Sequence, residues 1–211
     1  MAKVATTILA TTPDDFKART DRVKPFTKRL HVDVSDGIFT NNKTVGLAQV
    51  YGIDGVELDL HLMLQHPEHD YENALAVEPN LIICHFESEG DIPAMLGKIR
   101  EVGIKSGLAI KQETTIEQVK DILPNIDHLL VFTGWLGFNG GEFDAEPLAK
   151  IAAAKAINAN LEVAVDGGID QASARLAIQA GADVLDSGSF VQKSEDPEAA
   201  YLGLVAIAEG E

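Results

Sequence analysis

The amino-acid sequence predicts an α/β protein with a (β/α)8 TIM barrel. Two observations lead to this fold class. Strand-like and helix-like stretches alternate along the whole chain, and the strand starts recur at the spacing of a natural βα unit. No linker rich in Pro, Gly or Ser interrupts the 211 residues, so we expect one domain over residues 1–211.

Eight short stretches rich in aliphatic and β-branched residues have the flanking residues typical of strands. The expected strands cover residues 4–9, 29–34, 55–60, 81–86, 106–110, 128–132, 162–165 and 183–186. The connection after the sixth strand is the longest, because it contains the glycine-rich loop 134–141. Eight strands, each followed by a helix, favour a closed barrel.

A helix-like stretch follows each expected strand. Thr12 and Pro13 are typical of an N-cap and a first turn, and Gly103 and Gly181 are typical of the residue after a helix. The expected helices cover residues 13–23, 45–51, 67–76, 92–102, 115–123, 146–157, 171–180 and 197–208. An open doubly wound sheet is the alternative, but it would need a glycine-rich turn after its first strand. Residues 7–16 contain no glycine.

The net charge of −16 limits the partners of the protein. With 33 acidic against 17 basic residues, the surface repels nucleic-acid phosphate and anionic lipid headgroups, and we expect neither nucleic acid nor membrane as a partner. The single cysteine, Cys84, cannot form an internal disulfide and stands in an apolar run, so packing is its expected role. We find neither a signal peptide nor an apolar run long enough to span a bilayer, and we expect a cytoplasmic protein.

The segment 31–37 carries the first candidate site. Residues two apart in a strand point to the same side, so His31 and Asp33 project together at the carboxyl end of the second expected strand. An imidazole beside a carboxylate is half of a divalent-metal site. The alternative interpretation is that His31 and Asp33 only hydrogen-bond to each other inside a barrel. On this segment alone, both interpretations stay open.

Further ionisable residues fall where other strands are expected to end, which is where barrels of this kind carry their chemistry. The whole set expected on this rim is His31, Asp33, Asp59, His61, His85, Glu87 and Asp166. Two histidines and two carboxylates fit one Zn²⁺, Mn²⁺ or Fe²⁺ ion. We do not expect His85 to be a ligand, and we expect Asp36 and Asp59 to orient ligating histidines or loop amides.

Three histidines receive no role at the site. His66 and His69 fall on an expected helix and should be exposed to solvent. His128 begins its strand, at the end of the barrel that serves stability.

Three glycine-containing loops predict a phosphate site. Residues 137–141, 167–168 and 187–189 follow the last three expected strands. Glycine at these places lets backbone amides approach an anion closely. Glycines that serve only tight turns would explain any one of these loops, but three neighbouring loops favour phosphate.

Taken together, these motifs resemble the ribulose-phosphate 3-epimerase family. Residues 31–37 read His-Val-Asp-Val-Ser-Asp-Gly, 59–63 read Asp-Leu-His-Leu-Met, and 165–169 read Val-Asp-Gly-Gly-Ile. The Gly-Phe segment at 137–138 and the Gly-Ser at 188–189 complete the order. The fold implied by the resemblance is a barrel of the ribulose-phosphate-binding type.

The resemblance also implies an activity and a set of site residues. It implies one divalent metal held by His31, Asp33, His61 and Asp166, with Asp33 and Asp166 as the acid/base pair. The residues that it implies for the sugar and its phosphate are Thr7, Met63, Gly137, Phe138, Asn139, Gly140, Gly167, Gly168, Gly188 and Ser189. The expected reaction inverts C3 of D-ribulose 5-phosphate to give D-xylulose 5-phosphate through an enediolate. The expected partner is a small phosphorylated sugar, and we expect a homo-oligomer.

Some residues depart from the family pattern, and they leave the substrate open. Thr7 stands where the family has serine, Ser35 where it has methionine, and Lys111 where asparagine is usual; Trp135 and Leu136 replace Asn-Pro. One alternative is therefore an epimerase for a six-carbon ketose phosphate of the allulose 6-phosphate type. A second is a lyase or synthase that uses Lys111 as a Schiff-base nucleophile. A third is a sugar-phosphate sensor without turnover, which the two aspartates disfavour.

Overall fold

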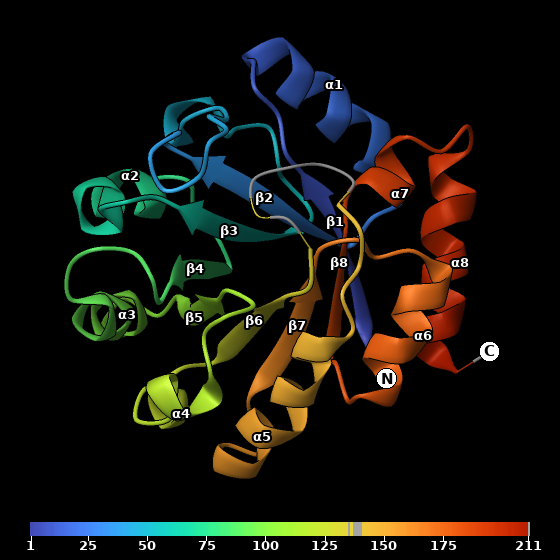
Figure 1. Cartoon of the computed structure of the whole chain (residues 1–211). Coiled ribbons are helices and arrows are strands. Elements are labelled where there is room, and N and C mark those ends of the chain that lie inside the picture. The colour runs from blue at the N-terminus through green and yellow to red at the C-terminus, as the bar shows by residue number, and fades with distance from the viewer. Residues whose placement is uncertain (135, 137–140, 211) are drawn as a thin grey trace.

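Eight parallel strands close into a barrel in the order β1 to β8, and this confirms the predicted fold class. The computed structural model describes residues 1–134, 136 and 141–210. The strands are β1 Lys3–Ile8, β2 Arg29–Ser35, β3 Glu57–Met63, β4 Leu81–His85, β5 Lys105–Ile110, β6 His128–Phe132, β7 Glu162–Asp166 and β8 Val184–Ser187. Figure 1 shows the helices as an outer ring around these strands.

The α-helices in the described part of the chain are α1 Pro13–Val23, α2 Tyr71–Leu75, α3 Ile92–Glu101, α4 Ile116–Val119, α5 Ala149–Ile157, α6 Gln171–Gln179, α7 Ser189–Gln192 and α8 Pro197–Glu209. Of these, α1, α3, α6 and α8 begin at the residue that the sequence pattern predicts, whereas α2 and α5 begin only after 3₁₀ turns at Pro67–Asp70 and Glu146–Leu148. The Thr12 hydroxyl accepts a hydrogen bond from the Asp15 amide at 3.2 Å, which is the N-cap contact expected at the start of α1. Among the described residues, no helix has the length and apolar character to cross a membrane.

Three helical segments differ from the prediction. The expected helix 115–123 is only the short α4, followed by a 3₁₀ turn at Leu123–Asn125. Pro124 lies inside this turn, where it lacks an amide donor and disfavours α-helical backbone in the preceding residue. The expected helix 45–51 is reduced to a 3₁₀ turn at Leu47–Gln49, and the short α7 was not predicted.

A small apolar layer fills the middle of the barrel. It consists of Ala5, Leu81, Ile83, Ala109, Leu130, Ala164 and Val184. Strand alternation places Ala164 between Glu162 at the amino end of β7 and Asp166 at its carboxyl end. The polar interior residues are thereby separated into two groups, one at each end of the barrel.

The amino-end group is a buried ion-pair network centred on Arg29. The Arg29 Nε lies 2.6 Å from Asp59 Oδ2, and its Nη2 lies 2.9 Å from Glu162 Oε2. His128 Nδ1 lies 3.0 Å from the same Glu162 oxygen. His128 therefore takes part in the interior of the amino end, where the sequence predicted it. Arg29 and Glu162 tie β2 to β7 across the barrel.

The expected position of Asp59 on the carboxyl-end rim is wrong. The sequence prediction ended the third strand at residue 60, whereas β3 continues to Met63. Asp59 therefore lies well inside the strand, and its carboxylate binds Arg29 rather than a histidine or a loop amide.

Candidate metal centre

Four buried side chains meet at the carboxyl end of the barrel. One ligand atom from each of His31, Asp33, His61 and Asp166 lies within 4.8 Å of the others, and among the described residues no other such group is found. β2 contributes His31 and Asp33, whose alternation places them on one side as predicted. β3 contributes His61, which is opposite Asp33 in the parallel register, and β7 contributes Asp166.

The geometry of these four residues fits a divalent metal. The Asp33 Oδ1 lies 2.8 Å from His61 Nδ1 and 3.3 Å from His31 Nε2. Both ring nitrogens of His31 are buried and lack a hydrogen-bond partner in the described part of the chain. Buried polar atoms normally have partners, so a buried nitrogen without a hydrogen bond, close to carboxylates, fits the role of a metal ligand. Two imidazoles and two carboxylates are a donor set that Zn²⁺, Mn²⁺ and Fe²⁺ accept.

The two carboxylates have opposite environments. Burial opposes ionisation of Asp33, but the adjacent imidazoles of His31 and His61 outweigh it and lower the pKa of Asp33. Burial and the charge of Asp33 raise the pKa of Asp166 well above its ordinary value. The proton affinities of the two carboxyl groups are thus moved in opposite directions, which is the division that acid/base pairs use.

The two histidines of this group have pKa values that are shifted in opposite directions. Burial alone would lower the pKa of His31, but the carboxylates of Asp186, Asp33 and Asp166 raise it to about 10. Burial lowers the pKa of His61 to about 3. Metal binding at His31 would therefore release a proton.

His85 lies outside the group of four, as expected, but it contacts a member of the group. Its Nε2 lies 2.8 Å from His61 Nε2, and its Nδ1 lies 3.2 Å from Glu87 Oε2. The other Glu87 oxygen accepts hydrogen bonds from the Lys111 amide at 2.9 Å and from the Thr114 hydroxyl. A continuous chain of polar contacts therefore runs from His61 to the loop after β5.

Asp36 organises two loops at the mouth of the barrel. Its carboxylate accepts hydrogen bonds from the amides of Ile38 at 2.7 Å, Phe39 at 2.8 Å and Gln65 at 2.7 Å. The expectation that Asp36 orients loop amides agrees with these contacts. His66 and His69 are largely exposed, with 42% and 73% of their side-chain surface accessible.

The loop after β7 has the backbone that the phosphate prediction requires. Gly167 and Gly168 have φ angles of +111° and +70°, and a Cβ at Gly167 would lie 2.3 Å from the Gly134 nitrogen. Only glycine fits there. The Thr133 hydroxyl donates to the Gly167 carbonyl at 2.8 Å and anchors this loop to the end of β6.

The other residues predicted for the sugar and phosphate fall in three places. Thr7 is buried near the end of β1, and its hydroxyl has no hydrogen-bond partner among the described residues. Met63 is buried at the end of β3, while Gly188 and Ser189 lie where β8 passes into α7. Outside the described residues lie Gly137, Phe138, Asn139 and Gly140.

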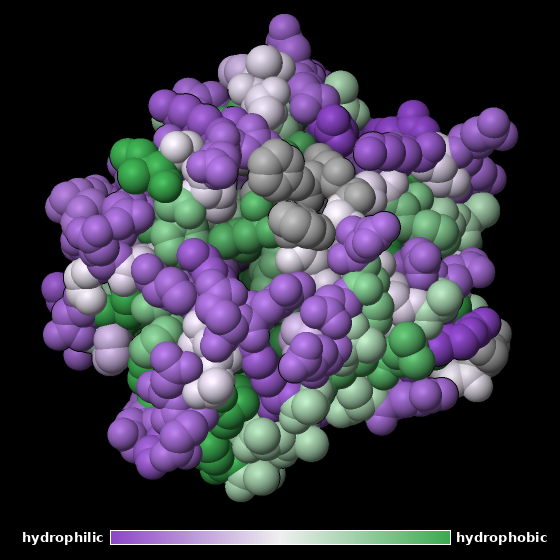
Figure 2. Space-filling view, viewed as in Figure 1, coloured by the Kyte–Doolittle hydropathy of each residue, from purple (hydrophilic) through white to green (hydrophobic). Residues whose placement is uncertain are grey.

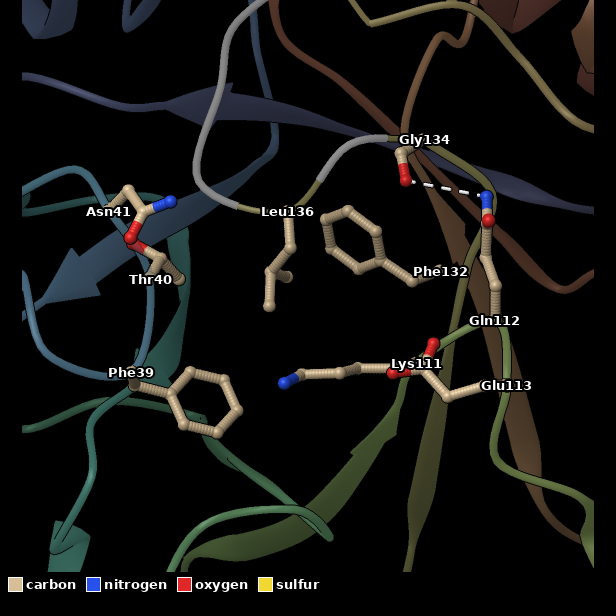
Figure 3. Close-up of a pocket in the computed structure, with 9 residues that line it drawn as sticks. All are labelled: Phe39, Thr40, Asn41, Lys111, Gln112, Glu113, Phe132, Gly134 and Leu136. Atoms are coloured by element: carbon tan, nitrogen blue, oxygen red, sulfur yellow. Dashed lines mark hydrogen bonds between the residues drawn. The ribbon is translucent and has the colours of Figure 1, made fainter.

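A cavity of about 400 Å³ is lined by Phe39 and Phe132, whose rings lie near those of His85 and His61. Figure 3 shows Phe39, Phe132 and Leu136 around it, with the Lys111 side chain extending toward the Phe39 ring. The Lys111 Nζ lies 4.4 Å from the centre of that ring. The ring centroids of Phe39 and His85 are 4.7 Å apart. The cavity therefore borders the series of polar contacts that leads through His85 to His61. Figure 2 shows hydrophobic residues in the hollow at the centre of an otherwise largely hydrophilic face.

The sequence prediction missed one buried carboxylate near the metal centre. Asp186 on β8 is 2% exposed, and its Oδ2 lies 3.5 Å from His31 Nδ1. The signal was present, because Val184 and Asp186 share the inward face of β8 just as Ala164 and Asp166 share that of β7. The prediction treated Asp186 only as the last residue of its strand.

Comparisons with known protein families and sequences find similarity over most of the chain. A family model described as "Ribulose-phosphate 3 epimerase family" matches residues 3–192. The ribulose-phosphate 3-epimerase of Mycobacterium tuberculosis is 36% identical over 185 residues, covering 83% of this chain and 80% of the relative. The enzyme of the same name from Bacillus subtilis is 30% identical over 208 residues, covering 93% and 94%.

Solved structures with the same architecture are more distant in sequence. The 3-keto-L-gulonate-6-phosphate decarboxylase of Vibrio cholerae superposes with a TM-score of 0.77 at 13% identity, covering 99% of this chain and 97% of that one. The 3-hexulose-6-phosphate synthase of Salmonella typhimurium gives 0.76 at 14% identity, covering 98% of each. At these identities the likeness shows the fold alone.

Proposed function

The chain belongs to the ribulose-phosphate 3-epimerase family, isomerases that act on carbohydrate phosphates, and we propose that it inverts C3 of D-ribulose 5-phosphate to give D-xylulose 5-phosphate. The observation that carries this proposal is the pairing of Asp33 and Asp166. Their strands, β2 and β7, are far apart in the sequence, yet both carboxyl groups belong to one buried cluster. Two carboxyl groups with opposed proton affinities are the minimum equipment for inverting a carbon next to a ketone.

In the proposed reaction, the ionised carboxylate takes the proton from C3 on one face of the substrate. The electron pair of the broken C–H bond forms the C2–C3 double bond, and the C2 carbonyl becomes an enediolate oxygen. The protonated carboxyl group then delivers its proton to C3 on the opposite face, and the carbonyl re-forms. The two aspartates exchange protonation states in each turnover, so the reverse reaction uses them in exchanged roles.

His31, Asp33, His61 and Asp166 would hold one divalent metal, for which we propose Zn²⁺, Mn²⁺ or Fe²⁺. Bound there, the cation supplies positive charge that stabilises the negative oxygens of the enediolate. His85 and Glu87 orient His61 within this set, and the rings of Phe39 and Phe132 limit the access of water to it.

For the phosphate of the substrate, we propose the loops after β7 and β8. Gly167 and Gly168 have positive φ angles and place no side chain of their own beside the backbone amides of this loop, and Gly188 precedes the turn into α7. This assignment also explains how a protein with a net charge of −16 can bind a phosphate, because backbone amides attract an anion without any basic residue. A homo-oligomer and a cytoplasmic location stay predictions of the sequence.

The proposal is tested by metal analysis and a direct assay on the purified protein. We expect near-stoichiometric metal, epimerisation of D-ribulose 5-phosphate, and loss of this activity after chelation with recovery on adding metal back. A His31→Ala/His61→Ala double variant should lose both metal and activity. Full metal content in that variant, or undiminished turnover after complete metal removal, would contradict the assignment.

A second candidate is an epimerase for a six-carbon ketose phosphate. The cavity of about 400 Å³ beside Phe39 and Phe132 favours it, because this space borders rings that lie near His85 and His61 and carries the Lys111 ammonium. A longer sugar would place an additional hydroxyl there. Comparing kcat/KM for D-ribulose 5-phosphate and D-allulose 6-phosphate decides between the two substrates.

A further inference from the structure

Asp186 is a buried carboxylate without a hydrogen bond. It projects from β8 into the barrel, and both of its oxygens lack hydrogen-bond partners among the described residues. Burying such a group without a partner is costly, so a protein retains it only where it is compensated. The nearest group able to compensate is the His31 imidazole, whose Nδ1 lies 3.5 Å from Asp186 Oδ2.

His31 lies between two carboxylates that differ in their position relative to the metal centre. Its Nε2 faces Asp33, a member of the candidate ligand set, at 3.3 Å. Its Nδ1 faces Asp186, which is not a member of that set. One nitrogen of the ring therefore points into the centre, and the other points at a carboxylate behind it.

We propose that Asp186 is a positioning residue for the metal: its carboxylate holds the His31 proton on Nδ1 and so presents Nε2 as the ligand atom. A carboxylate behind a ligating histidine fixes its tautomer and ring orientation and makes it a stronger ligand. This inference rests on the metal site of the proposed function. It adds a residue from a fourth strand, β8, to a centre whose ligands come from β2, β3 and β7.

The inference predicts a loss of metal binding that a loss of fold stability does not explain. In the metal-free protein, His31 and Asp186 form a buried pair at 3.5 Å, so replacing Asp186 removes one partner and should lower the stability of the fold. In the metal-bound protein, the same replacement removes the charge that orients His31. A residue that only packs the barrel would change the stability and leave the Zn²⁺ affinity unchanged.

The experiment measures Zn²⁺ affinity and metal-free thermal stability in the full-length chain. Asp186→Asn keeps the size of the side chain and one acceptor oxygen, and Asp186→Val removes the acceptor as well. The matched control is Val184→Ala, which changes a buried inward-facing residue of the same strand that lies in the apolar layer. Affinity is measured by competition with a chromophoric chelator, and stability by the Tm after complete metal removal.

We expect Zn²⁺ binding to weaken in the order wild type, Asp186→Asn, Asp186→Val, with a loss of about 10- to 100-fold in the second variant. The metal-free Tm of Asp186→Asn should fall, because one partner of the buried pair with His31 is removed. Val184→Ala should lower the Tm and leave Zn²⁺ affinity unchanged.

Two results would overturn the inference. The first is an Asp186→Val protein that binds Zn²⁺ within about twofold of the wild type while the wild type binds it tightly. The second is a Val184→Ala protein whose Zn²⁺ affinity falls as far as that of Asp186→Val, because the affinity would then follow fold stability alone. A wild-type chain that binds no Zn²⁺, Mn²⁺ or Fe²⁺ contradicts the metal site itself, and with it this inference.

Discussion

The Nε2 atoms of His61 and His85 face each other at 2.8 Å, so one of these nitrogens donates a proton and the other accepts it. The Nδ1 of His85 lies 3.2 Å from a Glu87 oxygen and therefore carries a proton that it donates to that carboxylate. With His85 neutral, its Nε2 is the acceptor, and His61 is the donor. The Nδ1 of His61 would then carry a lone pair, and a cation held between it and Asp33 Oδ1, 2.8 Å away, would join the two acceptors.

The series of contacts from His61 through His85 to Glu87 predicts that Glu87 supports metal binding although it is not a ligand. Glu87→Gln offers an amide in place of the carboxylate that accepts the His85 proton, so the tautomers of both histidines are no longer specified. We expect the Zn²⁺ affinity to fall about 10-fold or more. The control is Glu89→Gln, an exposed residue of the same loop, which should bind Zn²⁺ as the wild type does. Equal affinities in the two variants would show that Glu87 has no such role.

Lys111 should not form a covalent intermediate. Its ammonium contacts the Phe39 ring, and the structure provides it with no adjacent carboxylate partner among the described residues to accept its proton. Borohydride treatment in the presence of D-ribulose 5-phosphate should leave the protein mass unchanged. A stable adduct that is absent from Lys111→Met would instead support a Schiff-base lyase or synthase.

Glu162 should make the stability of the barrel depend on pH. Burial opposes its ionisation, but contacts with His128 and Arg29 lower its pKa below the ordinary 4.5. The unfolded chain therefore binds this proton at a higher pH than the folded chain does. The stabilisation is fully present above about pH 4.5 and is lost as the pH falls toward the lowered folded-state value.

Urea unfolding at several pH values measures this contribution. Glu162→Gln should reduce the free energy of unfolding by roughly 1.5–3 kcal/mol at pH 7 and by less at low pH, because charged hydrogen bonds are lost only where the carboxylate is ionised. Lys3 also contacts Glu162 but is exposed, so Lys3→Gln serves as a control with little effect. A pH-independent loss in Glu162→Gln would contradict the interpretation.

The parts of the site that follow from local alternation could be predicted from the sequence. His31 and Asp33 are two apart in β2, and the alternation of a strand alone places them on one side. The closed barrel then brings Asp166 of β7 to the same end. The loops at Gly167 and Gly188 could be predicted because glycine marks places where the backbone turns or must remain uncovered.

Other parts depend on depth inside the barrel, which the sequence does not give. Asp59 and His61 share one face of β3, but only the true end of the strand at Met63 decides that Asp59 binds Arg29 instead of joining the centre. The role of Asp186 likewise depends on a contact between β8 and β2, two strands that are not neighbours in the barrel. Strand alternation can place Asp186 on the inward face of β8, but its contact with His31 forms only after the barrel closes.

The central claim is that Asp33 and Asp166 serve opposite faces of one carbon. Asp33→Asn and Asp166→Asn should each lower turnover by about 10²–10⁴-fold or more, since each removes a proton-transfer group. The double variant should be little worse than either single variant, because neither proton transfer is useful alone. Metal content is measured for each variant, which separates loss of the acid/base group from loss of the metal.

The most direct measurement is ¹H NMR of D-ribulose 5-phosphate in D₂O with each single variant in its metal-loaded form. We predict that one variant exchanges the C3 proton for deuterium without forming D-xylulose 5-phosphate, because the base on one face still works while the acid on the other is missing. The other variant should do neither in this direction. Near-normal epimerisation by both metal-loaded variants would contradict the two-aspartate mechanism.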